Sequence, residues 1–216
     1  PEDYPMVAFE SENRIINTGD KPWKRETGLL SIWILSMLNA SGNGLVGIPY
    51  SHGSEKELGP VVTDDYFGKV PSDRLVVTDS VILFRADAEY RSKIGLSPSR
   101  ALDRMFGYDP ETGDLTIALF SVPQPGSGYV NSKWEYQNNP FSGDAVNAYN
   151  DGPNEHGGRM GNFYELESSS PAAALTPGDS LIHIHRTIHF GGGKKKTAPL
   201  LRAVFGISER HLQLLK

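Results

Sequence analysis

Three of the six histidines of the chain lie in one ten-residue segment, residues 181–190, which reads LIHIHRTIHF. Residue types alternate here as they do in a β-strand, in which successive side chains point to opposite faces. His183, His185 and His189 therefore share one face with Thr187, and the isoleucines share the other. We expect the isoleucines to face the core and the histidines to line a polar groove.

The histidine spacing also fits a metal ion. Neighbours on one face of a strand are about 6.6 Å apart, so His183 and His185 could bind one divalent ion at the ~2.1 Å usual for zinc and imidazole nitrogen. His189 lies about 13 Å from His185 by the same geometry and could not join them. The candidates for a third ligand are Glu165, Glu167, Asp151 and His156. A polar groove without metal, with no cofactor expected, is favoured; a metal site and a surface strand without a role are the alternatives.

Two carboxylates, Glu165 and Glu167, share one face of a strand predicted over residues 162–168. Such a pair can act as general acid and base if the surroundings separate the two pKa values. The alternative is an ordinary solvent-facing strand. Because the chain turns back at residues 171–178, we expect this strand beside the histidine strand, with a Glu base and a His acid around one ligand. The predicted catalytic residues are His183, His185, Glu165 and Glu167.

A sugar is the ligand that the remaining polar and aromatic residues suggest. An exposed Trp134 could stack against the C–H face of a pyranose ring, although core packing is the more common role of tryptophan. Residues 142–161 are rich in Asn, Asp, Gly and Pro, and a loop of that length is usually functional or mobile. The predicted substrate-binding residues are Trp134, Asn150, Asp151 and His189.

The segments that would position these residues are mostly strands. Gly and Pro turn signals punctuate the chain at the intervals typical of β proteins. We expect residues 29–38 to be a strand buried on both faces, with a short helix as the alternative, and residues 108–114 to be a hairpin turn. The predicted strands are 6–17, 29–38, 44–50, 79–86, 101–106, 115–122, 129–137, 162–168 and 180–190.

The predicted fold class is all-β, a twisted antiparallel β-sandwich with a short C-terminal helix. The apolar spacing of residues 198–215 is helical, and Gly206 is expected to break that helix into two pieces. A chain of 216 residues suits a single large β domain spanning residues 1–216. Because it opens on Pro1, we expect that an N-terminal segment has been removed.

Composition excludes several classes of protein. A net charge of −5 argues against a nucleic-acid partner, and the basic run Lys194, Lys195 and Lys196 is expected to be a solvated loop. The chain has no cysteine, which excludes disulfides and thiolate chemistry. No apolar run approaches the roughly 18 residues of a membrane span.

Seven segments together resemble an uncharacterised bacterial domain family of the galactose-mutarotase-like, or supersandwich, type. They are ESENRIINTG at 10–19, GLLSIWIL at 28–35, GPVVTDDYFGK at 59–69, YRSKIGLS at 90–97, NAYNDGP at 147–153, FYELESSSP at 163–171 and PGDSLIHIHRTIH at 177–189. The resemblance implies a supersandwich, of which these residues would be the C-terminal part, and a periplasmic or extracellular location. It also implies a carbohydrate ligand, although the Asn-His-x-Tyr-Phe segment of the epimerases is not present.

Three functions remain open. The first is a carbohydrate-binding or carbohydrate-processing domain that transfers protons at a sugar carbon or ring oxygen, as a sugar isomerase or epimerase does. The second is a cupin-like metal-dependent enzyme, because Gly178 followed by His183 and His185 loosely matches the cupin motif, one residue short. The third is a non-catalytic module that binds a glycan or a protein.

Overall fold

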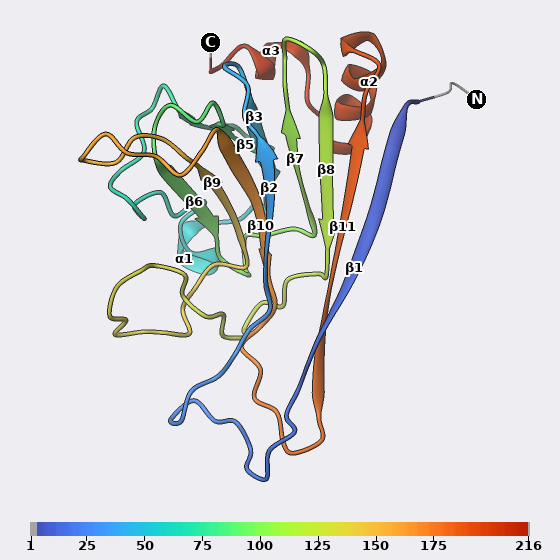
Figure 1. Ribbon diagram of the computed structural model, residues 1–216. Helices are drawn as coiled ribbons and strands as arrows, with labels where there is room; N and C mark the ends of the chain where they lie inside the picture. The colour runs from blue at the N-terminus through green and yellow to red at the C-terminus, as the bar shows by residue number, and fades with distance from the viewer. Residues whose placement is uncertain (1–3, 216) are drawn as a thin grey trace.

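The computed structural model describes residues 4–215, and it consists of two antiparallel sheets packed face to face. The larger sheet has seven strands in the order β1-β11-β8-β7-β3-β5-β4, and the smaller has four in the order β2-β10-β9-β6 (Figure 1). The larger sheet comprises β1 (Met6–Ile16), β3 (Leu45–Pro49), β4 (Leu75–Val77), β5 (Val81–Arg85), β7 (Arg104–Tyr108), β8 (Leu115–Phe120) and β11 (Ser180–Phe190). The smaller comprises β2 (Trp33–Asn39), β6 (Ser92–Leu96), β9 (Val146–Asn150) and β10 (Phe163–Ser169).

The main core fills the space between the sheets. Phe84 and Met105 of the larger sheet pack there with Ile94, Val146 and Leu166 of the smaller sheet, and all five are fully buried. Because side chains alternate along a strand, each strand of the smaller sheet presents its other residues on the outer face, away from the core. That outer face carries the polar residues described below.

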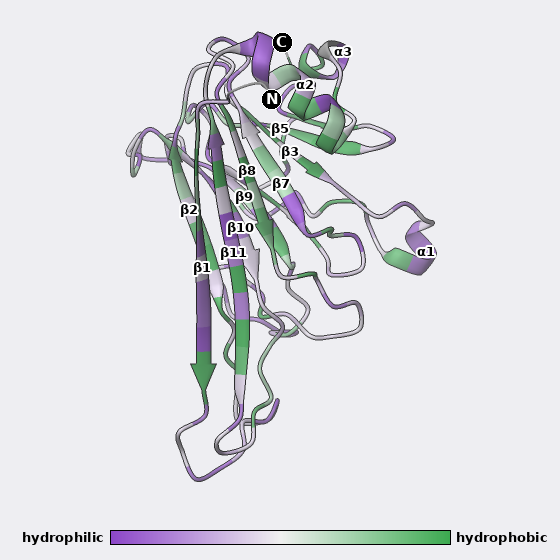
Figure 2. Cartoon of the chain, turned by 90° about the vertical axis from the view of Figure 1, so that its right-hand side faces the viewer, coloured by the Kyte–Doolittle hydropathy of each residue, from purple (hydrophilic) through white to green (hydrophobic). Residues whose placement is uncertain are grey.

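A second core lies on the opposite face of the larger sheet, where α2 (Lys194–Phe205) and α3 (Glu209–Leu212) pack against it. Phe205 of α2 meets Phe106 of β7 with ring centroids 4.6 Å apart. Gly206 ends α2 in the left-handed conformation, at φ 68°, which confirms the predicted break. Figure 2 shows both helices at one end of the sandwich. A further short helix, α1 (Glu55–Leu58), lies in the connection after β3.

Several elements agree with the sequence prediction. Strand β11 has the predicted bounds, the 108–114 hairpin joins β7 to β8, and the tail is helical. The antiparallel sandwich with a short C-terminal helix is thus confirmed as the fold class. Among residues 4–215, no helix is long and apolar enough to cross a membrane.

Four local predictions are wrong. The 29–38 segment is not buried on both faces, because only one face of β2 is covered by the larger sheet and its residues alternate in exposure. Residues 129–137 form a loop with one isolated bridge rather than a strand. The presumed long loop 142–161 contains β9, and Lys194 to Lys196 form the first turn of α2.

Candidate functional site

The histidines of β11 face the interior between the sheets instead of a groove. His183 and His185 are 1% and 2% exposed, whereas Ile182 on the opposite face is 41% exposed. The prediction reversed the two faces. The reason is that the smaller sheet covers the histidine face, and the hydroxyl groups of that sheet satisfy the imidazoles.

Two serines link the histidines in one chain of hydrogen bonds across the sandwich. Ser168 Oγ of β10 lies 2.8 Å from His183 Nε2 and 2.8 Å from His185 Nδ1, and Ser36 Oγ of β2 lies 3.0 Å from His185 Nε2. The ring of His185 also stacks on Phe120, with centroids 6.0 Å apart. These contacts tie β11 to both β10 and β2.

Burial sets the charge of both histidines. It lowers the pKa of His183 and that of His185 to about 4, so both are neutral near pH 7. In the part of the chain that the structure describes, no group of three or more His, Asp or Glu side chains is placed to hold a metal. His189 is only partly buried, and its Nδ1 lies 2.9 Å from Thr116 Oγ1.

The buried histidines predict acid sensitivity. A histidine with a pKa near 6.5 when unfolded and about 4 when folded stabilises the protein above pH 6.5 and loses that contribution as the pH falls towards 4. We expect the free energy of unfolding to lose about 1.4 kcal/mol per pH unit for each histidine in this window. Urea unfolding at pH 7, 6 and 5 measures the loss.

The control for this prediction is a His183→Gln, His185→Gln double variant, which keeps hydrogen-bonding side chains and removes the titration. Its stability should depend less on pH than that of the wild type. Glu165 and Asp144, with raised pKa values, act in the opposite direction and are unchanged by the variant. Equal pH dependence in both proteins would contradict the prediction.

Glu165 and Glu167 point away from the histidines, because they lie on the outer face of β10 while Ser168 and Leu166 point inward. Strand β10 also belongs to the smaller sheet and β11 to the larger one. The predicted shared site of Glu and His side chains is therefore wrong. The structure instead gathers a different set of residues around the two carboxylates.

Strand register places these residues in rows across the outer face. Glu165 lies between Tyr149 of β9 and Met37 of β2, and Tyr149 lies opposite Lys93 of β6. In the next row Glu167 lies between Asn147 and Leu35, and Asn147 lies opposite Gly95.

The centre of this face is a buried ion pair. Lys93 Nζ lies 2.8 Å from Glu167 Oε2, and the side chains are only 6% and 1% exposed. Trp33 Nε1 donates a second hydrogen bond to the same oxygen at 2.8 Å. The ammonium group lies 4.8 Å from the centre of the Trp33 ring and 5.2 Å from that of Tyr66. Glu167 Oε1 is buried and has no hydrogen-bond partner among the described residues.

Glu165 is the carboxyl group of this face whose pKa lies nearest to neutral pH. Burial, followed by the negative charge of Glu167, raises its pKa to about 7, and Lys93 offsets part of this rise. Near neutral pH, Glu165 is therefore present in both protonation states. It is 8% exposed, and its neighbours Leu35 and Met37 are exposed apolar side chains, 42% and 61%. The two carboxylates thus differ in role: Glu167 is ion-paired, and Glu165 can exchange a proton.

A further buried carboxyl group, that of Asp144, lies beside this face. Tyr66 donates a hydrogen bond of 2.7 Å to Asp144 Oδ2, and Asn147 Nδ2 donates one of 3.0 Å to the Tyr66 hydroxyl. Burial raises the pKa of Asp144 to about 6. Gly95 makes room for this contact, since a Cβ atom there would lie 2.0 Å from Asp144 Oδ2.

Two pockets open where this face ends. One, of about 670 Å³, is lined by Phe67, Glu89, Tyr90, Arg91, Pro153, Asn154, Glu155 and His156. The other, of about 300 Å³, is lined by Arg91, Asp151, Gly152, Asn154, Gly158, Arg159 and Met160. Tyr149 joins them to the carboxylates, because its hydroxyl donates to Asp151 Oδ1 at 2.7 Å and its ring meets that of Phe67 at 5.9 Å.

The predicted substrate-binding residues are scattered. Trp134 is 92% exposed on the loop 129–143, and the adjacent Lys133 ties that loop to Asp65 and covers the Tyr66 ring at 5.5 Å. Asp151 reaches one of the pockets. Asn150 is fully buried, and it holds the turn before β6 through Ala88 N and Tyr90 O.

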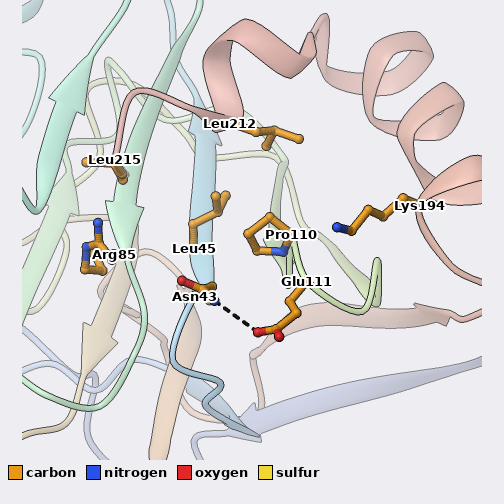
Figure 3. Close-up of a pocket in the computed structure, with 9 residues that line it drawn as sticks. Asn43, Leu45, Arg85, Pro110, Glu111, Lys194, Leu212 and Leu215 are labelled. Atoms are coloured by element: carbon orange, nitrogen blue, oxygen red, sulfur yellow. Dashed lines mark hydrogen bonds between the residues drawn. The ribbon is translucent and has the colours of Figure 1, made fainter.

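A separate pocket of about 430 Å³ lies between the C-terminal helices and the β7–β8 hairpin (Figure 3). Arg85 and Lys194 line it with Leu45, and Glu111 there accepts a hydrogen bond of 3.0 Å from Asn43. Leu45 belongs to the second core, on the face of the larger sheet away from the carboxylates. The pocket contains none of the predicted site residues.

The two packed sheets form an antiparallel β-sandwich whose fold is mutarotase-like, as a solved structure shows. The structure described as "Putative aldose 1-epimerase" from Escherichia coli K12 matches with a TM-score of 0.50 and 12% identity, over 85% of this chain and 56% of that chain. The Slr1438 protein of Synechocystis sp. PCC 6803 matches with a TM-score of 0.46 and 13% identity, over 86% and 51%. The chain thus spans about half the length of these structures.

The chain belongs to the Family of unknown function (DUF6786), whose family model matches residues 1–215. No curated protein sequence matches it. The prediction of a single β-sandwich domain over residues 1–216, as the C-terminal part of a larger native domain, stays a prediction, as does a periplasmic or extracellular location.

Proposed function

We propose that this protein binds and processes a carbohydrate on the outer face of the smaller sheet, with Glu165 as the group that transfers a proton. The observation that carries this proposal is the position of Glu165 between Tyr149 and Met37, next to the buried Lys93–Glu167 ion pair, in surroundings that raise the pKa of Glu165 to about 7. A general base works best when its pKa is close to the operating pH. The mutarotase-like fold supports the sugar as substrate class, by analogy.

Each neighbouring group has a role in this proposal. Glu165 removes the proton of the anomeric hydroxyl as the C1–O5 bond of the ring breaks and the ring oxygen takes up a proton from water. The reverse steps close the ring on either face. The apolar surface of Leu35 and Met37 contacts the C–H face of the ring. Glu167 and Lys93 are positioning residues, because their ion pair fixes the charge next to Glu165. Trp134, on the loop tied down by Lys133, extends the binding surface as an exposed stacking platform.

The experiment is a test of anomer interconversion. A panel of aldoses and uronic acids is incubated with the protein, and exchange between α and β anomers is followed by NMR against the uncatalysed rate. Acceleration by the wild type and its loss in Glu165→Gln are the expected results. Saccharide binding without turnover would contradict the enzyme and leave a binding module, and the absence of both would contradict the proposal.

A further inference from the structure

The outer face of the smaller sheet, which carries Glu165 and Glu167, is called the carboxylate face below. Arg91 lies at its end and lines both pockets there. Its guanidinium group is 4.2 Å from the centre of the Phe67 ring, which fixes its orientation. The positive charge of Arg91 acts on the Tyr149 hydroxyl, so Arg91 is close to the row that contains Glu165.

The acidic groups around Arg91 have other partners. Glu89 lies 3.7 Å from Arg159, and Glu155 lies 3.5 Å from His156. Asp151 accepts hydrogen bonds from the Tyr149 hydroxyl and from Gly161 N. Within residues 4–215, Arg91 itself forms no salt bridge. It is therefore a permanent positive charge that is held against an aromatic ring, lies beside the Tyr149 hydroxyl and lines two pockets.

Strand register relates Arg91 to the proposed reaction centre. Arg91 is two residues before Lys93, and Glu165 is two strands away in the row of Lys93. Strand spacings of ~4.8 Å across the sheet and ~3.3 Å per residue put the two backbone positions about 12 Å apart. Tyr149 lies between the strands of Lys93 and Glu165, and its hydroxyl is near the charge of Arg91, so a ligand that covers Tyr149 reaches from Arg91 to Glu165.

We infer that the substrate is a saccharide that bears an anionic oxygen group and that Arg91 binds this group while Glu165 acts on the same sugar unit. The group is a carboxylate, as in a uronic acid, or a sulfate or phosphate ester. A guanidinium group binds such groups through two parallel hydrogen bonds. The inference rests on the proposed function, because it takes the carboxylate face as the reaction centre.

The test compares matched sugars. Binding of galacturonate, galactose 6-sulfate, galactose 6-phosphate and galactose is measured by NMR titration at constant ionic strength, with the glucose series in parallel. We expect at least one anionic sugar to bind more tightly than its neutral counterpart. Arg91→Gln should weaken that binding about tenfold to a hundredfold, the loss typical of a charged hydrogen-bonded contact, and should leave the neutral sugar unaffected.

Two further variants separate the effect of charge from that of the paired donors and provide a control. Arg91→Lys keeps the charge but not the paired donors, and we expect an intermediate loss of affinity. Arg202→Gln on α2, remote from the face, is the control and should bind like the wild type. The carboxylate, sulfate and phosphate arms identify the anionic group.

The inference and the proposed function fail differently. If neutral and anionic sugars bind or react equally well and Arg91→Gln changes neither, the inference is overturned while the proposed function stands. If no sugar of either kind binds or reacts, the proposed function fails and the inference falls with it. Circular dichroism and the melting temperature of each variant confirm that it is folded.

Discussion

Replacement of Glu165 by glutamine is expected to lower the rate of anomer interconversion by a factor of about 10² to 10⁴, the usual contribution of one general base. Glutamine has the shape of the carboxyl group but cannot accept the proton. The loss should be in kcat rather than in KM, because the side chain still fills its place beside Tyr149 and Met37. Steady-state kinetics of the two proteins measure the effect.

The pH profile separates this role from a structural one. With a pKa of about 7, Glu165 must lose its proton to act as a base, so kcat/KM should rise with pH and level off above pH 7. In Glu165→Gln, this inflection should disappear. A profile that is flat across pH 6 to 8 in the wild type, or unchanged in the variant, would contradict the assignment.

Folding is not expected to explain the loss. The raised pKa means that the folded protein favours protonated Glu165 and that its charged form costs stability above pH 7. Neutral glutamine removes that cost, so the variant should melt no lower than the wild type at pH 8. Glu26→Gln, at an exposed site outside the face, is the matched control and should retain full activity.

The Lys93→Met substitution is expected to give the largest loss of stability. It leaves Glu167 as an uncompensated charge at 1% exposure, and breaking a buried ion pair in this way usually costs about 3–5 kcal/mol. Methionine fills a similar volume, so the loss would come from charge and not from a cavity. Urea unfolding at pH 7 measures it.

Two comparisons make this result specific. Adding Glu167→Gln to Lys93→Met should restore much of the stability, because a buried pair replaced on both sides is often nearly neutral. Arg14→Met breaks the exposed pair with Glu12, whose side chains are 47% and 54% exposed, and should cost less than about 1 kcal/mol. A Lys93→Met variant as stable as Arg14→Met would show that the buried pair has no such role.

The sequence indicated most strands of the larger sheet, but it missed β4, β6 and β9 and did not give the orientation of the strands. Alternation in residues 180–190 predicts a strand and divides its residues between two faces, but it does not say which face is inside. Both faces of β11 suit a covered position, because Ile188 packs towards the second core and His185 finds Ser36 and Ser168 in the main one. The deciding partners are far away in the sequence.

For the same reason, only part of the carboxylate face can be predicted from the sequence. Glu165 and Glu167 carry a local signal, two carboxylates at strand spacing. Lys93, Trp33 and Tyr66 complete the site from three other segments. None of the three has a local pattern that joins it to the others. The order β2-β10-β9-β6 brings Trp33 and Lys93 into one sheet, and the segment of Tyr66 joins β6 through the bridge between Thr63 and Gly95. The one local clue was a lysine, Lys93, in a short segment that reads SKIGL.

Trp33 gives the protein an optical reporter of its own site. Its indole N–H is bonded to Glu167, and the Lys93 ammonium lies over its ring, so its emission depends on the electric field at the carboxylate face. The chain has three tryptophans, and Trp23→Phe with Trp134→Phe would leave Trp33 as the sole fluorophore. Its spectrum would then follow the ionisation of Glu165 and the arrival of a ligand without any added label.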